Sequence, residues 1–280
     1  MSGAEMPDAE YHAHPALSYS TGKEYLRSPA HYKRALSHRV DRPAFDMGHA
    51  IHKVILGKGG QVVEIPADML AKNGAVSTAE AKAFVAEQRE AGNIPLKAGQ
   101  IMQAHAAAAE VLANADARRY LDLPGEAEVP LFATDPGSGV EIRGKVDYLP
   151  HQVKGARTFP VDIKSTTDAS PEAVRRTISN LHYDLQAAMY RHLIEQARGD
   201  KTGPMVQIWV EVEPPYGVLV VQIAHEDWIE GGNRKLALML SRHAEALRTG
   251  DWHAYPPGTH ALAPPGFYLP GIDYLEDITA

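Results

Sequence analysis

Alternating apolar and polar residues predict strands in the second half of the chain. In FPVDIKST, Val161 and Ile163 alternate with Asp162 and Lys164, which is the two-residue period of a strand with one apolar face. EAEVPLFAT and VEIRGKVDYLP are strand-like and are separated by DPGSG, so they predict a β-hairpin. MVQIWVEVE and GVLVVQIAH predict a second hairpin around PPYG.

Helical patterns surround these strands. An apolar helix is predicted over FDMGHAIHKVILG, where Gly57 could end it, and two short helices are predicted within residues 20–36, separated at Ser28 and Pro29. Further helices are expected over residues 78–91, 97–120, 171–180, 183–198 and 226–249, with a short strand at 61–65. Strands followed by a helix and further strands predict an α/β fold, with a mixed β-sheet flanked by helices and a helical N-terminal part.

The same patterns divide the chain into three parts. We expect residues 1–20 to form a loosely ordered lead-in and residues 253–280, rich in Pro, Gly and aromatic residues, to form an extended tail. Residues 21–252 are predicted to be a single domain, with N-terminal helices in 21–120 and the core in 121–252.

Composition narrows the classes of protein. The 280 residues include no cysteine, which excludes disulfides and thiolate metal sites. There is no apolar run long enough for a transmembrane helix, and the N-terminus lacks the basic and apolar regions of a secretory signal, so we expect a cytoplasmic protein without membrane contact. The net charge of −7 is not that of a protein that coats nucleic acid, but it is compatible with a local basic groove.

The polar side of the predicted strands carries candidate chemistry. Asp147 lies near the end of one strand, and Asp162 and Lys164 point to the same side of the next. If these strands are neighbours, two carboxylates and a lysine meet at one place, where a cation such as Mg²⁺ or Mn²⁺ would relieve the repulsion between the acids. This chemistry favours metal-assisted hydrolysis of a phosphodiester. An isolated Asp-x-Lys is more often a solvated pair, so the motif needs support elsewhere.

That support is a resemblance to a known family. Asp147, Asp162 and Lys164 together resemble the PD-(D/E)xK nuclease core, with Val146 in place of the family's proline. MGHAIH is similar to the GxxxH signature and LQAAMY to the QxxxY signature of the RecB-like branch of this superfamily. YHAHPALSYSTGKEYLRSPAHYKRAL, TDPGSG and DASPEAVRRTISNLHYDLQAAMY further resemble the nuclease domain of exodeoxyribonuclease VIII (RecE) and RecE-like phage exonucleases, over about residues 11–193.

The resemblance implies a restriction-endonuclease-like core and a set of site residues. The metal ligands would be His52, Asp147, Asp162 and the backbone carbonyl of Ile163, and Lys164 would orient or activate the attacking water. Gln186 and Tyr190 lie four residues apart and share a helix face, which in this family borders the site. An acid of the preceding hairpin could support a second metal, and Glu128 fits this role by position, with Glu126 and Glu141 as alternatives.

The resemblance also implies an activity. The implied activity would be that of a Mg²⁺- or Mn²⁺-dependent exodeoxyribonuclease that digests double-stranded DNA, 5′→3′, inside a bacterial or phage-infected cell. The 3′ single-stranded tails would serve an annealing protein in recombination, and the enzyme would form a closed homo-oligomeric ring, a trimer or tetramer. Basic residues expected to contact DNA are Arg143, Lys145, Arg175, Arg176, Lys33 and Arg34.

Two alternatives stay open at this point. The same site could serve an endonuclease or a nuclease specific for single strands. The chain could also be a DNA-binding or assembly module without activity, although intact His52, Asp147, Asp162 and Lys164 argue against this.

Overall fold

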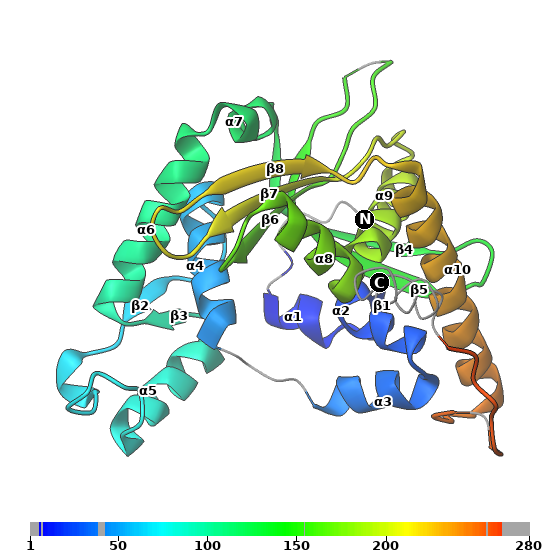
Figure 1. The fold of residues 1–280 in the computed structure, drawn as a ribbon, viewed down its shortest axis with the longest axis horizontal. Coiled ribbons are helices and arrows are strands. Elements are labelled where there is room, and N and C mark those ends of the chain that lie inside the picture. Colours follow the sequence, from blue (N-terminus) through cyan, green and yellow to red (C-terminus); the bar gives the residue numbers. More distant parts are fainter. Residues whose placement is uncertain (1–5, 7, 39–42, 154, 256, 265–280) are drawn as a thin grey trace, which may run out of the picture.

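A mixed β-sheet crosses the centre of the protein in the computed structural model, which describes residues 6, 8–38, 43–153, 155–255 and 257–264 (Figure 1). The strands are β1 (Leu17–Ser18), β4 (Gly125–Thr134), β5 (Glu141–Pro150), β6 (Val161–Thr166), β7 (Val206–Glu211) and β8 (Val218–Gln222). Their order is β1-β5-β6-β7-β8, with β4 paired to β5. The β6–β7 pair is parallel, whereas β4–β5, β5–β6 and β7–β8 are antiparallel.

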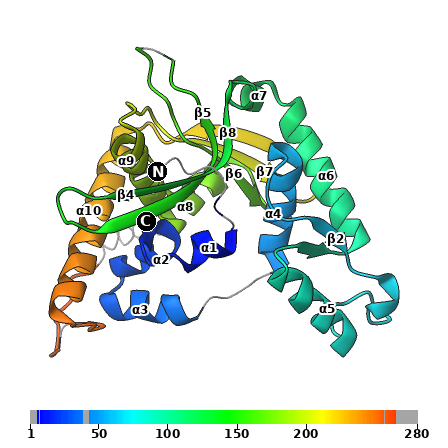
Figure 2. The same ribbon diagram turned by 180° about the vertical axis from the view of Figure 1, so that it is seen from behind.

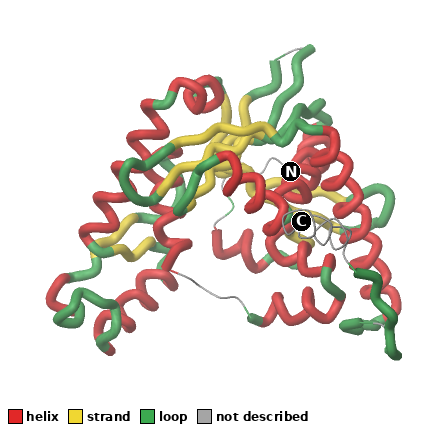
Figure 3. The backbone as a smooth tube through the Cα atoms, in the orientation of Figure 1, coloured by secondary structure: helices red, strands yellow, loops and turns green. Residues whose placement is uncertain are grey.

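Helices cover both faces of the sheet (Figures 1 and 3). One face packs against α8 (Pro171–Leu181) and α9 (Tyr183–Arg198), and α10 (Glu226–Thr249) packs against α9. The other face packs against α4 (Pro43–Leu56), α6 (Ala98–Ala113) and α7 (Ala115–Leu121). Between β6 and β7 the chain passes through α8 and α9, as a parallel strand pair requires. Among the described residues, no helix is both long and apolar enough to cross a lipid bilayer.

Smaller elements complete the molecule at its periphery (Figure 2). The N-terminal segment forms α1 (Asp8–Ala13), α2 (Tyr19–Gly22), the 3₁₀ turn η1 (Lys23–Leu26) and α3 (Pro29–Ser37), and the last two pack against α10. A two-stranded parallel sheet of β2 (Val62–Glu64) and β3 (Ile94–Leu96) lies beside α4 and α6, together with η2 (Ala67–Met69) and α5 (Ala79–Glu90).

The alternation along β6 decides which side chains reach which face. Val161 and Ile163 are buried in the apolar cluster that α4 and α6 form with the sheet. Asp162 and Lys164 therefore point to the opposite face, toward α9. The predicted mixed sheet with flanking helices is confirmed, and the polar face of β6 lies inside the molecule, not in open solvent.

Three features differ from the expectations drawn from the sequence. The lead-in is ordered in its second half, because Leu17 and Ser18 pair with β5 and the Tyr11 ring is buried. The helix expected over residues 97–120 is broken at Asn114, whose side chain accepts a hydrogen bond from the Ala117 amide and so begins α7. Strand β3 was not predicted, since three buried residues in a row show no period. Residues 253–264 contain no helix or strand where described, and the rest of the predicted tail lies outside the described residues.

Glycine at position 144 lets α9 approach β5. A Cβ atom there would lie 2.8 Å from Leu193 Cδ1 and 2.9 Å from Tyr190 Cε1. Both side chains belong to the buried core, so they have little room to move. The close contact between β5 and α9 therefore depends on the missing side chain.

We predict that Gly144→Ala lowers the free energy of unfolding by about 1–3 kcal/mol, because the added methyl overpacks this contact. Chemical denaturation measures the change. Gly99→Ala is the matched control, since nothing lies within 4 Å of its would-be Cβ and it sits in the first turn of α6. That variant should be neutral or slightly more stable, and equal destabilisation of both variants would contradict the packing argument.

Candidate metal centre

The candidate site lies where strands β5 and β6 separate. One edge of β5 pairs with β4 along its whole length, so β1 and β6 share the other edge. β6 contacts this edge through a single pair, Tyr148 opposite Val161, and then diverges from it. The Ile163 amide, which has lost a backbone partner on β5, donates instead to Asp147 Oδ2 at 2.8 Å. The Asp147 carboxylate thus fills a gap in the hydrogen-bond ladder.

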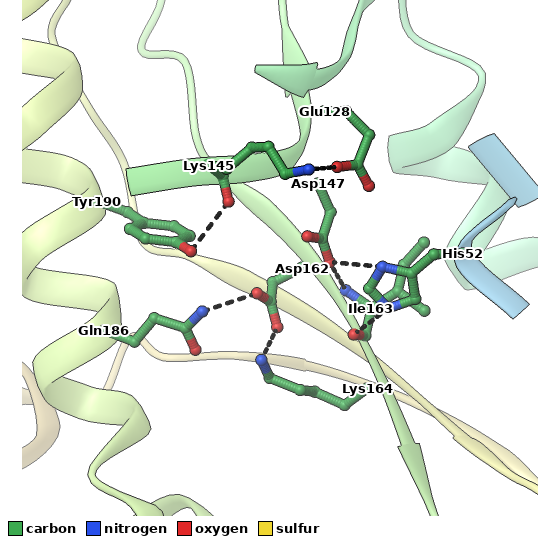
Figure 4. A network of polar contacts seen from close by, with 9 residues as sticks. All are labelled: His52, Glu128, Lys145, Asp147, Asp162, Ile163, Lys164, Gln186 and Tyr190. Atoms are coloured by element: carbon green, nitrogen blue, oxygen red, sulfur yellow. Dashed lines mark hydrogen bonds and ion pairs between the residues drawn. The ribbon is translucent and has the colours of Figure 1, made fainter. Parts of the chain in front are cut away.

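Three side chains from separate elements meet at this fork (Figure 4). His52 of α4, Glu128 of β4 and Asp147 of β5 each place one potential ligand atom within 4.8 Å of the others. Within the described part of the chain, no other His, Asp or Glu residues form such a group. The structure therefore brings together two of the predicted ligands, His52 and Asp147, with Glu128, the acid predicted to support a second metal.

The helix that carries His52 is held close to β6. A Cβ atom at Gly48 would lie 3.1 Å from Ser165 Oγ, which explains the glycine of the GxxxH signature. One turn later, His52 Nε2 lies 2.8 Å from the Ile163 carbonyl oxygen. Because a carbonyl can only accept, Nε2 carries the proton and a neutral ring presents the lone pair of Nδ1 to the cluster. Nδ1 lies 3.6 Å from Asp147 Oδ2.

This contact changes the role expected for Ile163. Its carbonyl was predicted to be a metal ligand, but in the structure it accepts the hydrogen bond from His52. Metal-binding histidines commonly have their second nitrogen fixed by such an acceptor. The Ile163 carbonyl is therefore an orienting group for His52 in this arrangement.

Glu128 occupies an unusual backbone conformation. It lies opposite Asp147 in the β4–β5 register, between the pairs Ala127–Tyr148 and Val129–Val146, and has a φ of 54°. A positive φ is costly for a residue other than glycine and is often found at functional sites. Its carboxylate lies 2.6 Å from Lys145 Nζ. The competing acids lie elsewhere: Glu126 pairs with Arg198 at 3.0 Å, and Glu141 is exposed.

Asp162 and Lys164 form a second group beside the first. Asp162 is almost fully buried, accepts a hydrogen bond from Gln186 Nε2 at 2.9 Å, and lies 2.6 Å from Lys164 Nζ. Asp162 is not a member of the three-residue cluster, although it was predicted to be a ligand. Burial by itself would lower the pKa of Lys164, but the adjacent Asp162 carboxylate raises it above the ordinary lysine value.

The two residues of the QxxxY signature connect α9 to both strands. Gln186 holds Asp162 on β6, and the Tyr190 hydroxyl donates to the Lys145 carbonyl on β5 at 3.0 Å. That carbonyl belongs to the stretch of β5 that neither β1 nor β6 pairs with. Gln186 and Tyr190 thus contact both strands of the fork from the α9 face of the sheet, while α4 packs against the opposite face.

Tyr183 is a residue of this site that the sequence analysis missed. Lys164 Nζ lies 4.3 Å from the centre of its ring, within the range of a cation–π contact. Tyr183, Gln186 and Tyr190 occupy positions i, i+3 and i+7 of α9 and so share one helix face. This spacing was visible in the sequence.

The basic residues predicted to contact DNA are placed unevenly. Arg143 is buried beneath the N-terminal segment and donates to the carbonyls of Tyr11, His12 and Ala16, so its role is structural. Lys145 lies at the fork through its ion pair with Glu128. Arg175 and Arg176 are exposed on α8 and pair with Glu172 of the same helix. Lys33 and Arg34 are exposed on α3, with Lys33 over the Trp252 ring.

The electrostatics of the cluster favour a cation. Burial raises the pKa of Asp147 to about 7, and the charges of Asp162 and Glu128 act in the same direction. Lys164 opposes them, and His52 would do so only if its ring were charged. One imidazole nitrogen and two carboxylates form a donor set suited to a divalent ion such as Mn²⁺ or Mg²⁺. These residues fit the metal implied by the sequence, since a bound cation would stabilise the ionised form of Asp147.

The raised pKa predicts a specific pH dependence of stability without metal. Asp147 takes up a proton on folding between about pH 4 and 7, so its contribution is favourable below its unfolded pKa and is lost as pH rises through its folded pKa. Asp147→Asn keeps an acceptor oxygen for the Ile163 amide. In EDTA, we expect the variant to melt at a higher temperature than the wild type at pH 8 and at a similar temperature at pH 4. A variant that melts lower at pH 8 would contradict this account.

Removal of the Glu128 charge should weaken metal binding. We predict that Glu128→Gln raises the Kd for Mn²⁺ at least about tenfold, measured by isothermal titration calorimetry. Glu126→Gln is the matched control, because it makes the same chemical change two residues away on the same strand. Equal affinities of Glu128→Gln and the wild type would exclude Glu128 as a ligand.

Comparisons with known proteins bear on the fold and the family of this chain. The chain resembles a crystal structure of a candidate exonuclease from Eubacterium rectale, with a TM-score of 0.57 and 13% identity over 89% of this chain and 88% of the other. This likeness shows a shared restriction-endonuclease-like fold. A second structure, SSO0001, has a TM-score of 0.30 at 13% identity, over 77% of this chain and 81% of the other. A search of curated proteins gives no match.

The match to a family model covers most of the protein. Residues 18–256 match the model described as a PDDEXK-like domain of unknown function (DUF3799). This range contains the fork, α4 and α9, and the match supports nuclease activity in general. The chain belongs to the DUF3799 family of PDDEXK-like domains.

Proposed function

We propose that this protein is a metal-dependent exodeoxyribonuclease that hydrolyses double-stranded DNA in the 5′→3′ direction. The observation that carries the proposal is the meeting of two groups at one fork: the His52–Glu128–Asp147 cluster and the buried Asp162–Lys164 pair. The first group suits a divalent cation and the second supplies a positive hydrogen-bond donor beside it. The sequence resemblance to RecE-like exonucleases supports the choice of substrate and direction.

Each residue of the fork has a distinct task in this reaction. His52, Glu128 and Asp147 would hold Mg²⁺ or Mn²⁺, which supplies Lewis-acid stabilisation of the phosphate and a more acidic bound water. Lys164 donates hydrogen bonds to the attacking water or to the non-bridging oxygens on which negative charge grows. Asp162 fixes the Lys164 ammonium, and Gln186 fixes Asp162.

The same proposal includes a biological context. An exonuclease of this polarity leaves 3′ single-stranded tails, which an annealing protein of a bacterial or phage recombination system would bind. A ring of three or four copies would retain the product strand and make digestion processive. The resemblance described above supports both points, and size-exclusion chromatography with light scattering tests the assembly.

Digestion of end-labelled DNA tests the activity. We expect the wild type with Mg²⁺ to release a 5′ label from a linear duplex early and a 3′ label late, to leave a covalently closed circle intact, and to stop in EDTA. Lys164→Ala should lower the rate by about 10²–10³-fold, because it removes a donor to the transition state. Lys82→Ala, at an exposed position on α5, is the control and should keep the wild-type rate.

The competing activities give different results in the same assay. Digestion of the closed circle would show an endonuclease, and digestion of single strands alone would show a different substrate class. Wild-type protein that releases no nucleotide with either metal would show an inactive module. Full activity of Lys164→Ala would overturn the mechanism.

A further inference from the structure

A second lysine is linked to Lys164 through a pair of tyrosine rings and plays no part in the cluster. Lys23, the first residue of η1, places its Nζ 5.5 Å from the centre of the Tyr19 ring. The rings of Tyr19 and Tyr183 are 6.3 Å apart, and Lys164 lies over the Tyr183 ring. The two lysines are therefore linked by a pair of tyrosine rings, although η1 and β6 are far apart in the sequence.

Lys23 differs from the other cations around the fork in lacking an acidic partner. Lys164 is paired with Asp162, Lys145 with Glu128, and Lys235 with Asp184 at 2.7 Å. The acid next to Lys23 in the chain, Glu24, lies 3.7 Å from Arg27 instead. Among the described residues, no carboxylate forms an ion pair with Lys23.

Burial and a neighbouring ammonium both disfavour the charge of Lys23. Burial lowers the pKa of Lys23, the charge of Lys164 lowers it further, and Glu24 offsets this only in part. Burial and the charges of Lys235 and Lys23 also lower the pKa of His182, at the junction of α8 and α9, while the charges of Asp184 and Glu24 oppose this. A half-buried ammonium without a counter-ion is stabilised by a bound anion.

A structural role alone does not account for this placement. A cation–π contact with Tyr19 contributes about 0.5–2 kcal/mol, and a lysine can make such a contact on an exposed ring without approaching another ammonium. Lys33 makes such a contact over the partly buried Trp252 ring at 5.1 Å. Lys23 instead lies over a ring that neighbours the ring beneath Lys164, and the phosphates of one DNA strand are anions in a row.

We propose that Lys23 binds a backbone phosphate of DNA next to the phosphate that is cleaved at Lys164. This inference rests on the proposed function and adds a substrate-binding residue outside the nuclease motifs. Tyr19 and Tyr183 would keep the two ammonium groups apart, so that each meets a different phosphate of the same strand. Lys23 then contributes to the binding of DNA, and the residues of the fork carry out the chemical step.

Salt dependence of digestion tests this role. Initial rates on a linear duplex with Mg²⁺ give KM and kcat between about 50 and 200 mM salt, and the loss of one phosphate contact makes the slope of log(1/KM) against log[salt] shallower by about 0.9. We expect Lys23→Met to show this change, with KM raised about tenfold and kcat within about twofold. Lys23→Arg should restore both the slope and KM, because it keeps the charge.

The controls separate binding from folding and from the proposed function. Lys82→Met makes the same chemical change on α5 and should leave KM and the slope unchanged. If Lys23 only stabilises the fold, Lys23→Met will lower the melting temperature but keep the wild-type salt slope, and that result would overturn the inference. Failure of the proposed function is a different result, namely wild-type protein that releases no nucleotide in the presence of Mg²⁺.

Discussion

The hydrogen bond from the Ile163 amide to Asp147 is the contact on which the site depends. It exists because β5 and β6 pair at only one position and then diverge, so a backbone donor of β6 needs a side-chain acceptor. The same contact fixes a carboxylate at the fork, close to Glu128 and Asp162. The divergence of the two strands thus places the Asp147 carboxylate where a cation can bind, and its hydrogen bond from the Ile163 amide keeps it there.

Two helices keep the fork open in a defined shape. From one side, α4 presents His52, and the absence of a side chain at Gly48 allows its close approach to β6. From the other side, α9 holds Asp162 through Gln186 and the β5 backbone through Tyr190. The site is therefore a product of packing on both faces of the sheet.

Most elements of the fold could be predicted from the sequence, because strands β4–β8 and helices α8–α10 have clear periods and turn signals. Asp147, Asp162 and Lys164 could be predicted to meet, since neighbouring strands bring their polar faces together. The sequence could not show that Asp162 pairs with Lys164 while Glu128 joins His52 and Asp147 in the cluster. These contacts depend on the positive φ of Glu128 and on the burial of Asp162. Nor could it show that Arg143 anchors the N-terminal segment, since a strand pattern does not reveal which loop covers it.

The central claim is that the fork between β5 and β6 binds a divalent cation through residues of three separate elements. A crystal structure of the protein with Mn²⁺, analysed by anomalous diffraction, tests this most directly. The account predicts a peak at the fork, about 2.0–2.6 Å from His52 Nδ1 and from carboxylate oxygens of Asp147 and Glu128. A fork without a peak at saturating Mn²⁺, or a peak that none of these three side chains contacts, would contradict it.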